Sequence, residues 1–414
     1  MGTGDNYVSI AAFDYGDSSK TPGKVSAGSG RDTLNVTAGA VLDSDLMANV
    51  TGFEVLDIGG GDGTAYAVKG LGFSEVTISK ALTAAGTVNG ITNETLSITA
   101  SETQGITYVI DGATASSSAS VTIAGDHVDV GADGDTSNDT NDLTVKGITI
   151  ATVGTVNIES NTDSQNEAGV TNTITALTTA AAKTLNVTGD HTLTIAGFAN
   201  NATITTINAE DAAGLIMGAG LKTATAVSIT GSAGNDTLVI DAARVGGNTL
   251  NPGKGGNIVT LGANATRDTL IINKGDSQIG YTDTNSDGAY VAAGDAETFD
   301  IITGFVSGTD LLDLGSFEFT GQKQSALATQ TLTAAQIVEL VDGTTSEIAD
   351  FFKDTGVVRG VATVSGVNAT SFGGAASSTV VFIDSDGSGS LEVANDDMIV
   401  LSGTASVALA DFGF

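Results

Sequence analysis

Apolar residues recur along the first hundred residues in pairs that are two positions apart. Successive pairs begin at positions 34, 56, 76 and 96, so the interval between them is almost constant. Because side chains alternate along a strand, both members of a pair face the same side. Each pair therefore predicts one short strand with a buried face, and the four pairs are Leu34/Val36, Leu56/Ile58, Val76/Ile78 and Leu96/Ile98.

A single strand of this kind cannot bury its apolar face, whereas strands stacked at a fixed period share one continuous core. The pattern therefore predicts an all-β chain built as a parallel β-solenoid, or β-helix, over positions 1–230, with rungs of about 20–22 residues. Val187, Ile207 and Val227 continue the same period. Regularly spaced short strands are also typical of an antiparallel sandwich, which is the alternative fold.

The period is blurred between positions 100 and 170. A Ser-rich stretch (113–120) and an Asp/Asn-rich stretch (129–143) lie there, and we interpret both as loops inserted into the solenoid. From 231 to 273 glycine becomes denser and the period shorter, which predicts a short β-roll of glycine-rich turns.

A C-terminal β-rich region follows from 274 to 414, and two short helices are expected within it. They lie near Thr333–Val341 and Thr344–Lys353. Each begins with Thr followed three positions later by Gln or Glu, the spacing of a capping box.

Charge and composition narrow the possible functions. The chain of 414 residues has 15 Lys+Arg against 48 Asp+Glu, a net charge of −33, which repels nucleic acids and anionic membrane surfaces. Cysteine is absent, which excludes disulfides and thiolate-bound metals. No apolar run reaches the length of a membrane span, and positions 1–20 contain none of signal-peptide length. Most acids are Asp beside Gly or Asn, an arrangement that suits Ca²⁺ or, alternatively, a merely soluble acidic surface.

One glycine-rich stretch, GSAGNDTLV (231–239), matches the calcium-binding nonapeptide G-G-x-G-x-D-x-U-x with Ser at the second Gly. Gly231 and Gly234 would allow positive φ, so that carbonyl groups turn toward a cation, and Asp236 would supply a carboxylate. A degenerate copy, AGSGRDTLN (27–35), places Asp32 in the acid position, and ATRDTL keeps only Asp268 of the acid position. A plain turn is the alternative for each copy, since the ion of a β-roll is shared between neighbouring turns.

Two other loops have the alternating oxygens and the central Gly of an EF-hand-like calcium loop. Both lack the Glu at position 12 and offer Asp at position 13 instead. A third stretch alternates similarly but lacks the hydrophobic position. The alternative for all three is an Asx-rich turn without an ion. The candidate ligands are Asp384, Asp386, Ser388 and Asp396 in the first loop, Asp283, Asn285, Asp287 and Asp295 in the second, and Asp133, Asp135 and Asp139 in the third.

Two of these stretches, AGSGRDTLNV and GSAGNDTLVI, occur with the segment FDIITGFVSGTDLLDL (299–314) and a close that runs from VVFIDSDGSGS to ALADFGF. With them the chain resembles RTX-type proteins exported by type I secretion, and most of all the calcium-dependent S-layer proteins of Gram-negative bacteria. The specific matches cover about 228–414. The resemblance implies an RTX-like β-roll over 231–273, a C-terminal export signal, and Asp310 as a further candidate ligand.

Catalytic motifs are missing from the sequence. His127 and His191 are the only histidines and lie far apart along the chain, and no H-E-x-x-H, G-x-S-x-G or P-loop occurs. We therefore expect no enzyme. The resemblance implies a secreted structural protein that forms a calcium-bridged two-dimensional layer on a cell, with copies of itself and cell-surface polysaccharide or lipopolysaccharide as partners. The alternatives are an RTX adhesin or biofilm-matrix module, and the export part of a secreted hydrolase.

Overall fold

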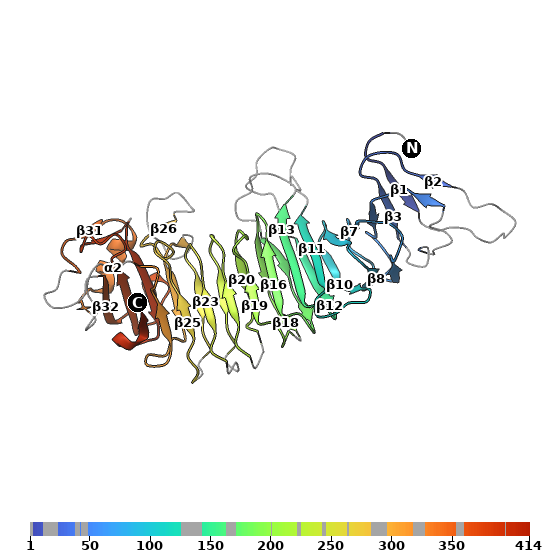
Figure 1. Ribbon diagram of the computed structural model, residues 1–414. Helices are drawn as coiled ribbons and strands as arrows, with labels where there is room; N and C mark the ends of the chain where they lie inside the picture. The colour runs from blue at the N-terminus through green and yellow to red at the C-terminus, as the bar shows by residue number, and fades with distance from the viewer. Residues whose placement is uncertain are drawn as a thin grey trace. The chain divides into compact units, whose positions relative to one another are not determined.

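The computed structural model of the chain describes most of its residues. These are 3–10, 24–37, 42, 49–125, 143–162, 171–199, 201–221, 225–241, 246–262, 265–282, 296–317, 328–352, 360–393 and 395–414. They form two compact units, Met1–Ile204 and Thr205–Phe414. Each unit contains long parallel sheets of short strands, which confirms the predicted parallel β-solenoid (Figure 1). The antiparallel sandwich is thereby excluded.

The first unit has two main sheets. In order of pairing, one contains β1 (Tyr7–Ile10), β3 (Thr33–Val36), β5 (Val55–Asp57), β7 (Glu75–Ile78), β9 (Thr95–Ile98), β11 (Ser118–Gly125), β13 (Thr155–Thr162) and β16 (Thr184–Thr188). The other contains β6 (Ala65–Ala67), β8 (Gly86–Ile91), β10 (Glu102–Ile110), β12 (Thr144–Ile150), β14 (Thr171–Ile174) and β17 (Thr192–Ile195), with β15 (Leu177–Thr179) and β18 (Phe198–Ala199) at its side. A separate small sheet pairs β2 (Val25–Ser26) with β4 (Val50–Thr51).

The predicted apolar pairs stack on one another in this unit. Leu34 is in register with Leu56, Leu56 with Val76, and Val76 with Leu96, and all four are buried. The Ser-rich stretch 113–120, interpreted above as an inserted loop, is a turn only up to Ser117, because Ser118–Ser120 begin β11. In β11 the alternation of Ser and Thr with apolar residues buries Ala119, whereas Ser-rich composition alone indicates a loop.

The second unit continues the same architecture. One sheet contains β19 (Thr206–Asn208), β21 (Ser228–Thr230), β23 (Thr249–Asn251), β25 (Thr269–Ile271), β29 (Leu311–Asp313) and β36 (Phe412–Gly413). The other contains β20 (Leu215–Met217), β22 (Thr237–Val239), β24 (Ile258–Thr260), β28 (Asp300–Thr303), β35 (Asp397–Ser402), β33 (Ser378–Ile383), β32 (Val361–Val367) and β30 (Ala328–Thr329). Strands β32, β33 and β35 add antiparallel pairs to the second of these sheets. In the first of these sheets Ile207 is in register with Ile229, so the predicted repeat position Val227 is wrong by two positions.

A second layer covers the end of the second sheet. It contains α2 (Ala334–Val341), η3 (Thr370–Phe372), the antiparallel pair β26 (Tyr281–Thr282) and β27 (Ala296–Glu297), and the antiparallel pair β31 (Glu347–Ile348) and β34 (Leu391–Glu392). The short η4 (Leu409–Asp411) instead contacts β29 of the other sheet. Helix α2 begins with the predicted capping box of Thr333 and Gln336. The second predicted helix, near Thr344–Lys353, is wrong over its described residues, which form turns and β31.

Packing explains the absence of that second helix. Phe351 and Phe352 are buried in the aromatic core beneath α2, and their rings are perpendicular, with centroids 5.1 Å apart. Phe382 of β33 contacts Phe351 in the same core. This core fixes β33 and β35, whose connection carries the candidate metal centre. No helix among the described residues is long and apolar enough to cross a membrane.

Candidate metal centre

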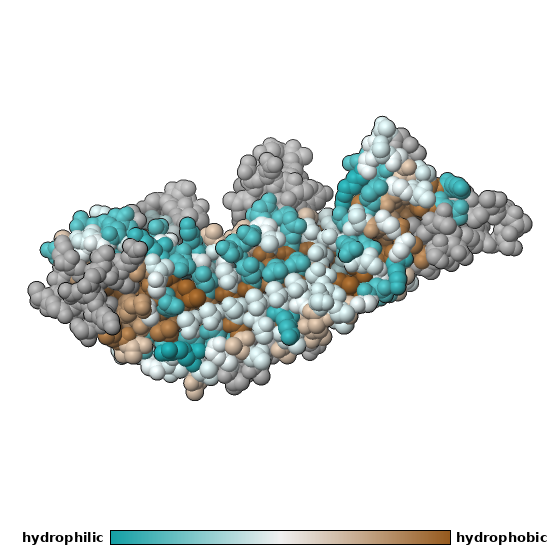
Figure 2. Space-filling view, viewed as in Figure 1, coloured by the Kyte–Doolittle hydropathy of each residue, from teal (hydrophilic) through white to brown (hydrophobic). Residues whose placement is uncertain are grey.

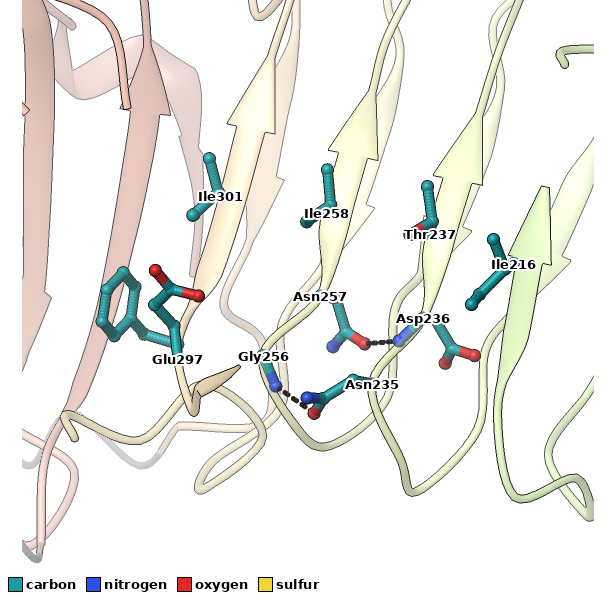
Figure 3. Close-up of a pocket in the computed structure, with 10 residues that line it drawn as sticks. Ile216, Asn235, Asp236, Thr237, Gly256, Asn257, Ile258, Glu297 and Ile301 are labelled. Carbon is teal, nitrogen blue, oxygen red and sulfur yellow. Dashed lines mark hydrogen bonds between the residues drawn. The ribbon is translucent and has the colours of Figure 1, made fainter. Parts of the chain in front are cut away.

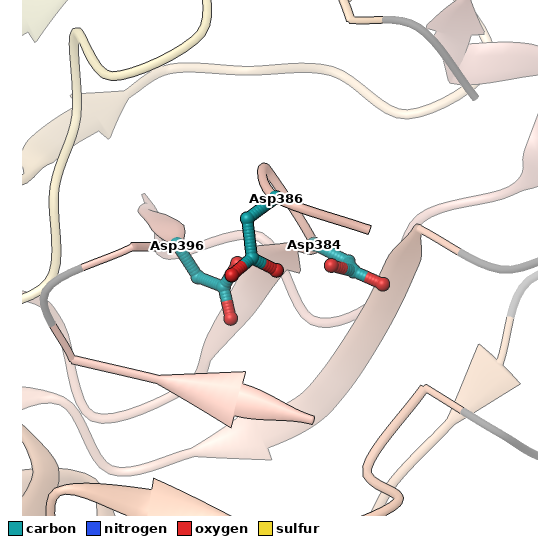
Figure 4. A group of neighbouring side chains, drawn as sticks. All are labelled: Asp384, Asp386 and Asp396. Atoms are coloured by element: carbon teal, nitrogen blue, oxygen red, sulfur yellow. The ribbon is translucent and has the colours of Figure 1, made fainter. Parts of the chain in front are cut away.

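The loop from Asp384 to Asp396 connects two paired strands. β33 and β35 are antiparallel, and their pairing closes with Ile383 opposite Asp397. Asp384 and Asp396 are the next residues outward on each side, so the hairpin brings them together although the whole loop separates them in sequence. Asp386 completes the group, and one carboxylate oxygen of each of the three lies within 4.8 Å of the others (Figure 4).

The backbone of the loop holds these carboxylates in place. Gly387 and Gly389 have φ of +78° and +80°, which glycine adopts without strain. Their N–H groups donate to the two oxygens of Asp384 at 2.7 and 3.0 Å. Leu391 is buried in the aromatic core and pairs with Ile348 of β31. The loop is therefore anchored at its hydrophobic position, as an EF-hand-like loop requires.

The carboxylate of Asp396 is also held by two backbone hydrogen bonds. Its two oxygens accept the N–H groups of Ser385 and Glu392, each at 2.8 Å. Each carboxylate oxygen has two lone pairs, so one remains for a cation after each of these bonds. Ser388 is exposed, and its hydroxyl bonds to the backbone of Ser390 within the loop.

Electrostatics at this loop favours a cation. Burial, together with the charges of Asp384 and Asp386, raises the pKa of Asp396 to about 7, although its backbone hydrogen bonds act to lower it. Burial also raises the pKa of the Asp384 carboxyl. Within the described residues none of the three forms an ion pair. The protein thus gathers negative charge here without a basic partner, and hard oxygen ligands of this kind are those that Ca²⁺ takes.

The nonapeptide Asp236 has a different environment. Its oxygens accept the N–H groups of Leu215 and Ser232 at 2.5 and 2.6 Å, and the Ser232 hydroxyl donates to both. Its own N–H donates to the Asn257 side chain in the next rung, beside a hollow of about 250 Å³ (Figure 3). Burial raises its pKa to about 6. Asp236 therefore ties rungs together, and its coordination of calcium stays a prediction.

Glycine is required in the nonapeptide for a reason other than the predicted one. Neither Gly231 nor Gly234 has positive φ, which corrects the expectation from sequence. A Cβ at Gly231 would lie 2.1 Å from the carbonyl oxygen of Pro252, and one at Gly234 would lie 1.9 Å from that of Ala213. These residues are glycine because neighbouring rungs approach too closely for a side chain.

The same rung-to-rung use of Asp recurs elsewhere. Oδ1 of Asp32 accepts both the backbone N–H and the side-chain amide of Asn6, at 2.8 and 2.5 Å. Asp300 binds both groups of Asn257 in the same way, at 3.1 and 2.8 Å. Asp310 accepts from the N–H of Asp268 at 2.9 Å, and burial raises its pKa. As with Asp236, these carboxylates accept hydrogen bonds from the backbone of neighbouring rungs. Their binding of calcium stays a prediction.

Several buried acids were not singled out from the sequence. Asp411 accepts hydrogen bonds from Ser307, Gly308 and Ala408, and thereby attaches the C-terminal turn to the GFVSGTD segment. Asp300 is fully buried, and its Oδ2 has no hydrogen-bond partner among the described residues. Asp300 begins β28 and Asp411 directly precedes β36, and both lie in segments that carry the resemblance, although neither was predicted as a ligand.

The other predicted ligands lie outside the described residues. They are Asp133, Asp135, Asp139, Asp283, Asn285, Asp287 and Asp295. His127 lies outside them too, whereas His191 is buried, and its Nδ1 lies 2.8 Å from Asp190. No protein-family model matches the chain, and no curated protein sequence matches it.

Proposed function

We propose that the chain is a secreted, non-enzymatic structural protein that assembles into a two-dimensional layer on a bacterial cell surface when calcium binds its Asp-rich loops. The cluster of Asp384, Asp386 and Asp396 supports this proposal most directly. It gathers three carboxylates on one hairpin, two of them buried and one exposed, and offers only oxygen ligands. Calcium bound there would neutralise part of the loop and fix its shape.

Net charge links calcium to assembly. A chain at −33 repels its own copies, and at physiological ionic strength this repulsion acts over roughly 8 Å. Apolar contacts between copies of the chain would offset little of this electrostatic repulsion. Large apolar side chains that are exposed within the described residues are few: Tyr7, Ile258, Val306 and Phe414. Figure 2 shows the corresponding surface, where hydrophobic residues appear only in patches between hydrophilic and neutral ones.

A calcium-dependent layer also fits the affinity expected of such a loop. Extracellular calcium modules have dissociation constants of about 10⁻⁴–10⁻³ M. At these values the sites are unoccupied inside a cell and occupied outside, so that folding and assembly follow export.

Isothermal titration calorimetry with Ca²⁺ tests the proposal, with Mg²⁺ as the competing ion. We expect sub-millimolar binding of Ca²⁺, with the binding at this cluster lost in Asp386→Asn and the stoichiometry reduced accordingly. Asp386 is chosen because this exposed side chain has the weakest structural role of the three. Binding of Mg²⁺ with equal affinity, or unchanged Ca²⁺ binding in that variant, would remove the basis of the proposal.

A further inference from the structure

An Asp–Gly peptide bond, Asp386–Gly387, lies in the exposed part of the loop between β33 and β35. Gly387 has no Cβ to shield its nitrogen from the carboxyl group of the preceding residue. The backbone N–H of Ser388 donates to Oδ1 of Asp386 at 2.8 Å. The ring that this hydrogen bond closes contains the Gly387 nitrogen, so the carboxyl group of Asp386 is held beside that nitrogen.

The N–H of Gly387 also meets a base. It donates to Oδ1 of Asp384 at 2.7 Å, within the distance over which a carboxylate can take a proton as a general base. Asp384 is 6 % exposed, and the N–H of Gly389 donates to its other oxygen at 3.0 Å, so its position is fixed. The carboxylates of Asp384 and Asp386 lie side by side (Figure 4). A nitrogen, a neighbouring carboxyl group and an oriented base are the parts of an activated nucleophile.

From these contacts we infer that Asp386–Gly387 is a site of spontaneous rearrangement to isoaspartate, with Asp384 as the general base. In the first step the Gly387 nitrogen forms a bond to Cγ of the protonated Asp386 carboxyl group, and Asp384 takes the proton of the amide. The bond from Cγ to the carboxyl hydroxyl then breaks, and the hydroxyl leaves as water with the proton that Asp384 returns. The product is a five-membered succinimide.

Water opens this succinimide in the second step. It adds to the main-chain carbonyl carbon of Asp386, the bond from that carbon to the Gly387 nitrogen breaks, and the nitrogen recovers a proton. The main chain then runs through Cγ, and the former main-chain carbonyl becomes the free carboxylate. Composition is unchanged, because one water is lost and one is gained. The backbone is longer by one carbon, so the carboxylate of Asp386 is displaced from Asp384 and Asp396.

Calcium at the cluster would suppress this reaction, and this part of the inference rests on the proposed function. An ion bound to Asp384 and Asp386 takes the lone pair that the base needs and holds the Asp386 carboxylate toward the ion. Chains that have not bound calcium would therefore lose the site with time, whereas chains that have bound it would keep the site.

A second Asp–Gly bond provides a matched control within the chain. At Asp342–Gly343 the N–H of Thr344 donates to Oδ1 of Asp342 at 2.8 Å, and the φ of Gly343 is +71°, against +78° for Gly387. The N–H of Gly343, however, donates to the carbonyl oxygen of Leu340 at 3.2 Å. An amide carbonyl is not a base, so the two bonds share the turn and differ in the carboxylate.

The test incubates the full chain at neutral pH in EGTA in water enriched in ¹⁸O. Each opening of a succinimide leaves one ¹⁸O, which peptide mass spectrometry locates, and isoaspartate methyltransferase counts the product. We expect Asp386 to gain label at least about tenfold faster than Asp342, and at least about tenfold more slowly in Asp384→Asn, because a general base contributes about 10²–10⁴-fold and buffer can replace part of it. In Asp386→Glu the label at this position should disappear, because a six-membered ring forms more slowly.

Two outcomes would overturn the inference: equal labelling of Asp386 and Asp342 in the native chain, or unchanged labelling in Asp384→Asn that circular dichroism shows to be folded. Adding 10 mM Ca²⁺ should slow labelling of Asp386 and leave that of Asp342 unchanged. Equal labelling with and without Ca²⁺, in a chain that calorimetry shows to bind the ion at this cluster, would refute the protective role. Absence of calcium binding would instead refute the proposed function, and the rearrangement in EGTA would stand.

Discussion

Without calcium, the stability of Asp396→Asn relative to the native chain should improve as pH rises. With calcium, the native chain should be the more stable of the two at pH 8. The folded protein raises the pKa of this carboxyl from 3.8 to about 7, because burial and the neighbouring Asp charges disfavour its ionised form. The folded state therefore binds the proton more tightly than the unfolded state does. Without a cation, the resulting stabilisation is lost as pH rises from about 4 to about 7.

The size of this effect follows from the shift. Three pKa units correspond to at most about 4 kcal/mol, at 1.36 kcal/mol per unit. Asn cannot ionise, so the stability of Asp396→Asn relative to the native chain should improve by up to this amount between pH 4 and pH 8 in EGTA. Asn also replaces one acceptor of a backbone N–H by a donor, which costs about 1–3 kcal/mol at every pH. The informative quantity is therefore the change with pH.

Calcium should reverse the comparison at pH 8. If its dissociation constant is about 10⁻⁴ M, 10 mM Ca²⁺ stabilises the native chain by about 2.7 kcal/mol, and the variant gains nothing. Urea unfolding followed by circular dichroism at pH 4 and pH 8, in EGTA and in Ca²⁺, measures the four values for each chain. Asp386→Asn is the matched control: it should lose the calcium effect but keep most of the pH effect, because burial, the main cause of the raised pKa of Asp396, is unchanged. Equal pH dependence of Asp396→Asn and the native chain in EGTA would refute the reasoning.

Three other substitutions separate structural from ligand roles. Gly234→Ala should destabilise the protein equally with and without calcium, because the added Cβ meets the Ala213 carbonyl oxygen 1.9 Å away; a thermal melt in both conditions measures this, and a loss confined to Ca²⁺ would contradict it. The stability of Asp300→Asn relative to the native chain should rise from pH 5 to pH 8, since burial and the charges of Asp276 and Asp397 raise the pKa of the native carboxyl; equal effects at both pH values in urea unfolding would count against this. Leu56→Ala should cost about 2–5 kcal/mol, because the side chain is fully buried between rungs, and a cost below about 1 kcal/mol would argue against a continuous core.

The solenoid could be predicted because its core imposes a repeat on the sequence. Each rung must present apolar residues inward at the same place, and Leu34, Leu56, Val76 and Leu96 do so at an almost constant interval. A shift of two positions keeps the inward face, which is why Val227 satisfied the pattern although Ile229 is the residue in register with Ile207. Period alone therefore predicts the fold better than the register.

The capping-box spacing at Thr344 predicted a helix wrongly, because packing against residues distant in sequence determines the structure there. Thr344 and Glu347 have capping-box spacing, yet the N–H of Thr344 bonds to Asp342, and Phe351 and Phe352 enter a core formed with β32 and β33. That core comes from residues distant in sequence on both sides, from Ile279 to Val400, so a local pattern carries no information about it.

The candidate metal loop could be predicted in part. Alternating Asp, Ser and Gly predicted a cation loop over 384–396, and the structure brings Asp384, Asp386 and Asp396 together. The hairpin explains why position 13 takes part, since Asp396 directly precedes the strand pair that closes the loop. By contrast, the nonapeptide could not reveal that Asp236 would be engaged by Leu215, because that bond links separate rungs.

Calcium-driven assembly is the central claim, and negative-stain electron microscopy of the purified chain tests it most directly. Samples in EGTA, in 10 mM Mg²⁺ and in 10 mM Ca²⁺ are compared with Asp386→Asn and Asp396→Asn in 10 mM Ca²⁺. The account predicts ordered sheets or tubes with Ca²⁺ alone, and their loss in both variants. Dispersed single particles of the native chain at 10 mM Ca²⁺, or sheets that form equally in EGTA, would contradict it.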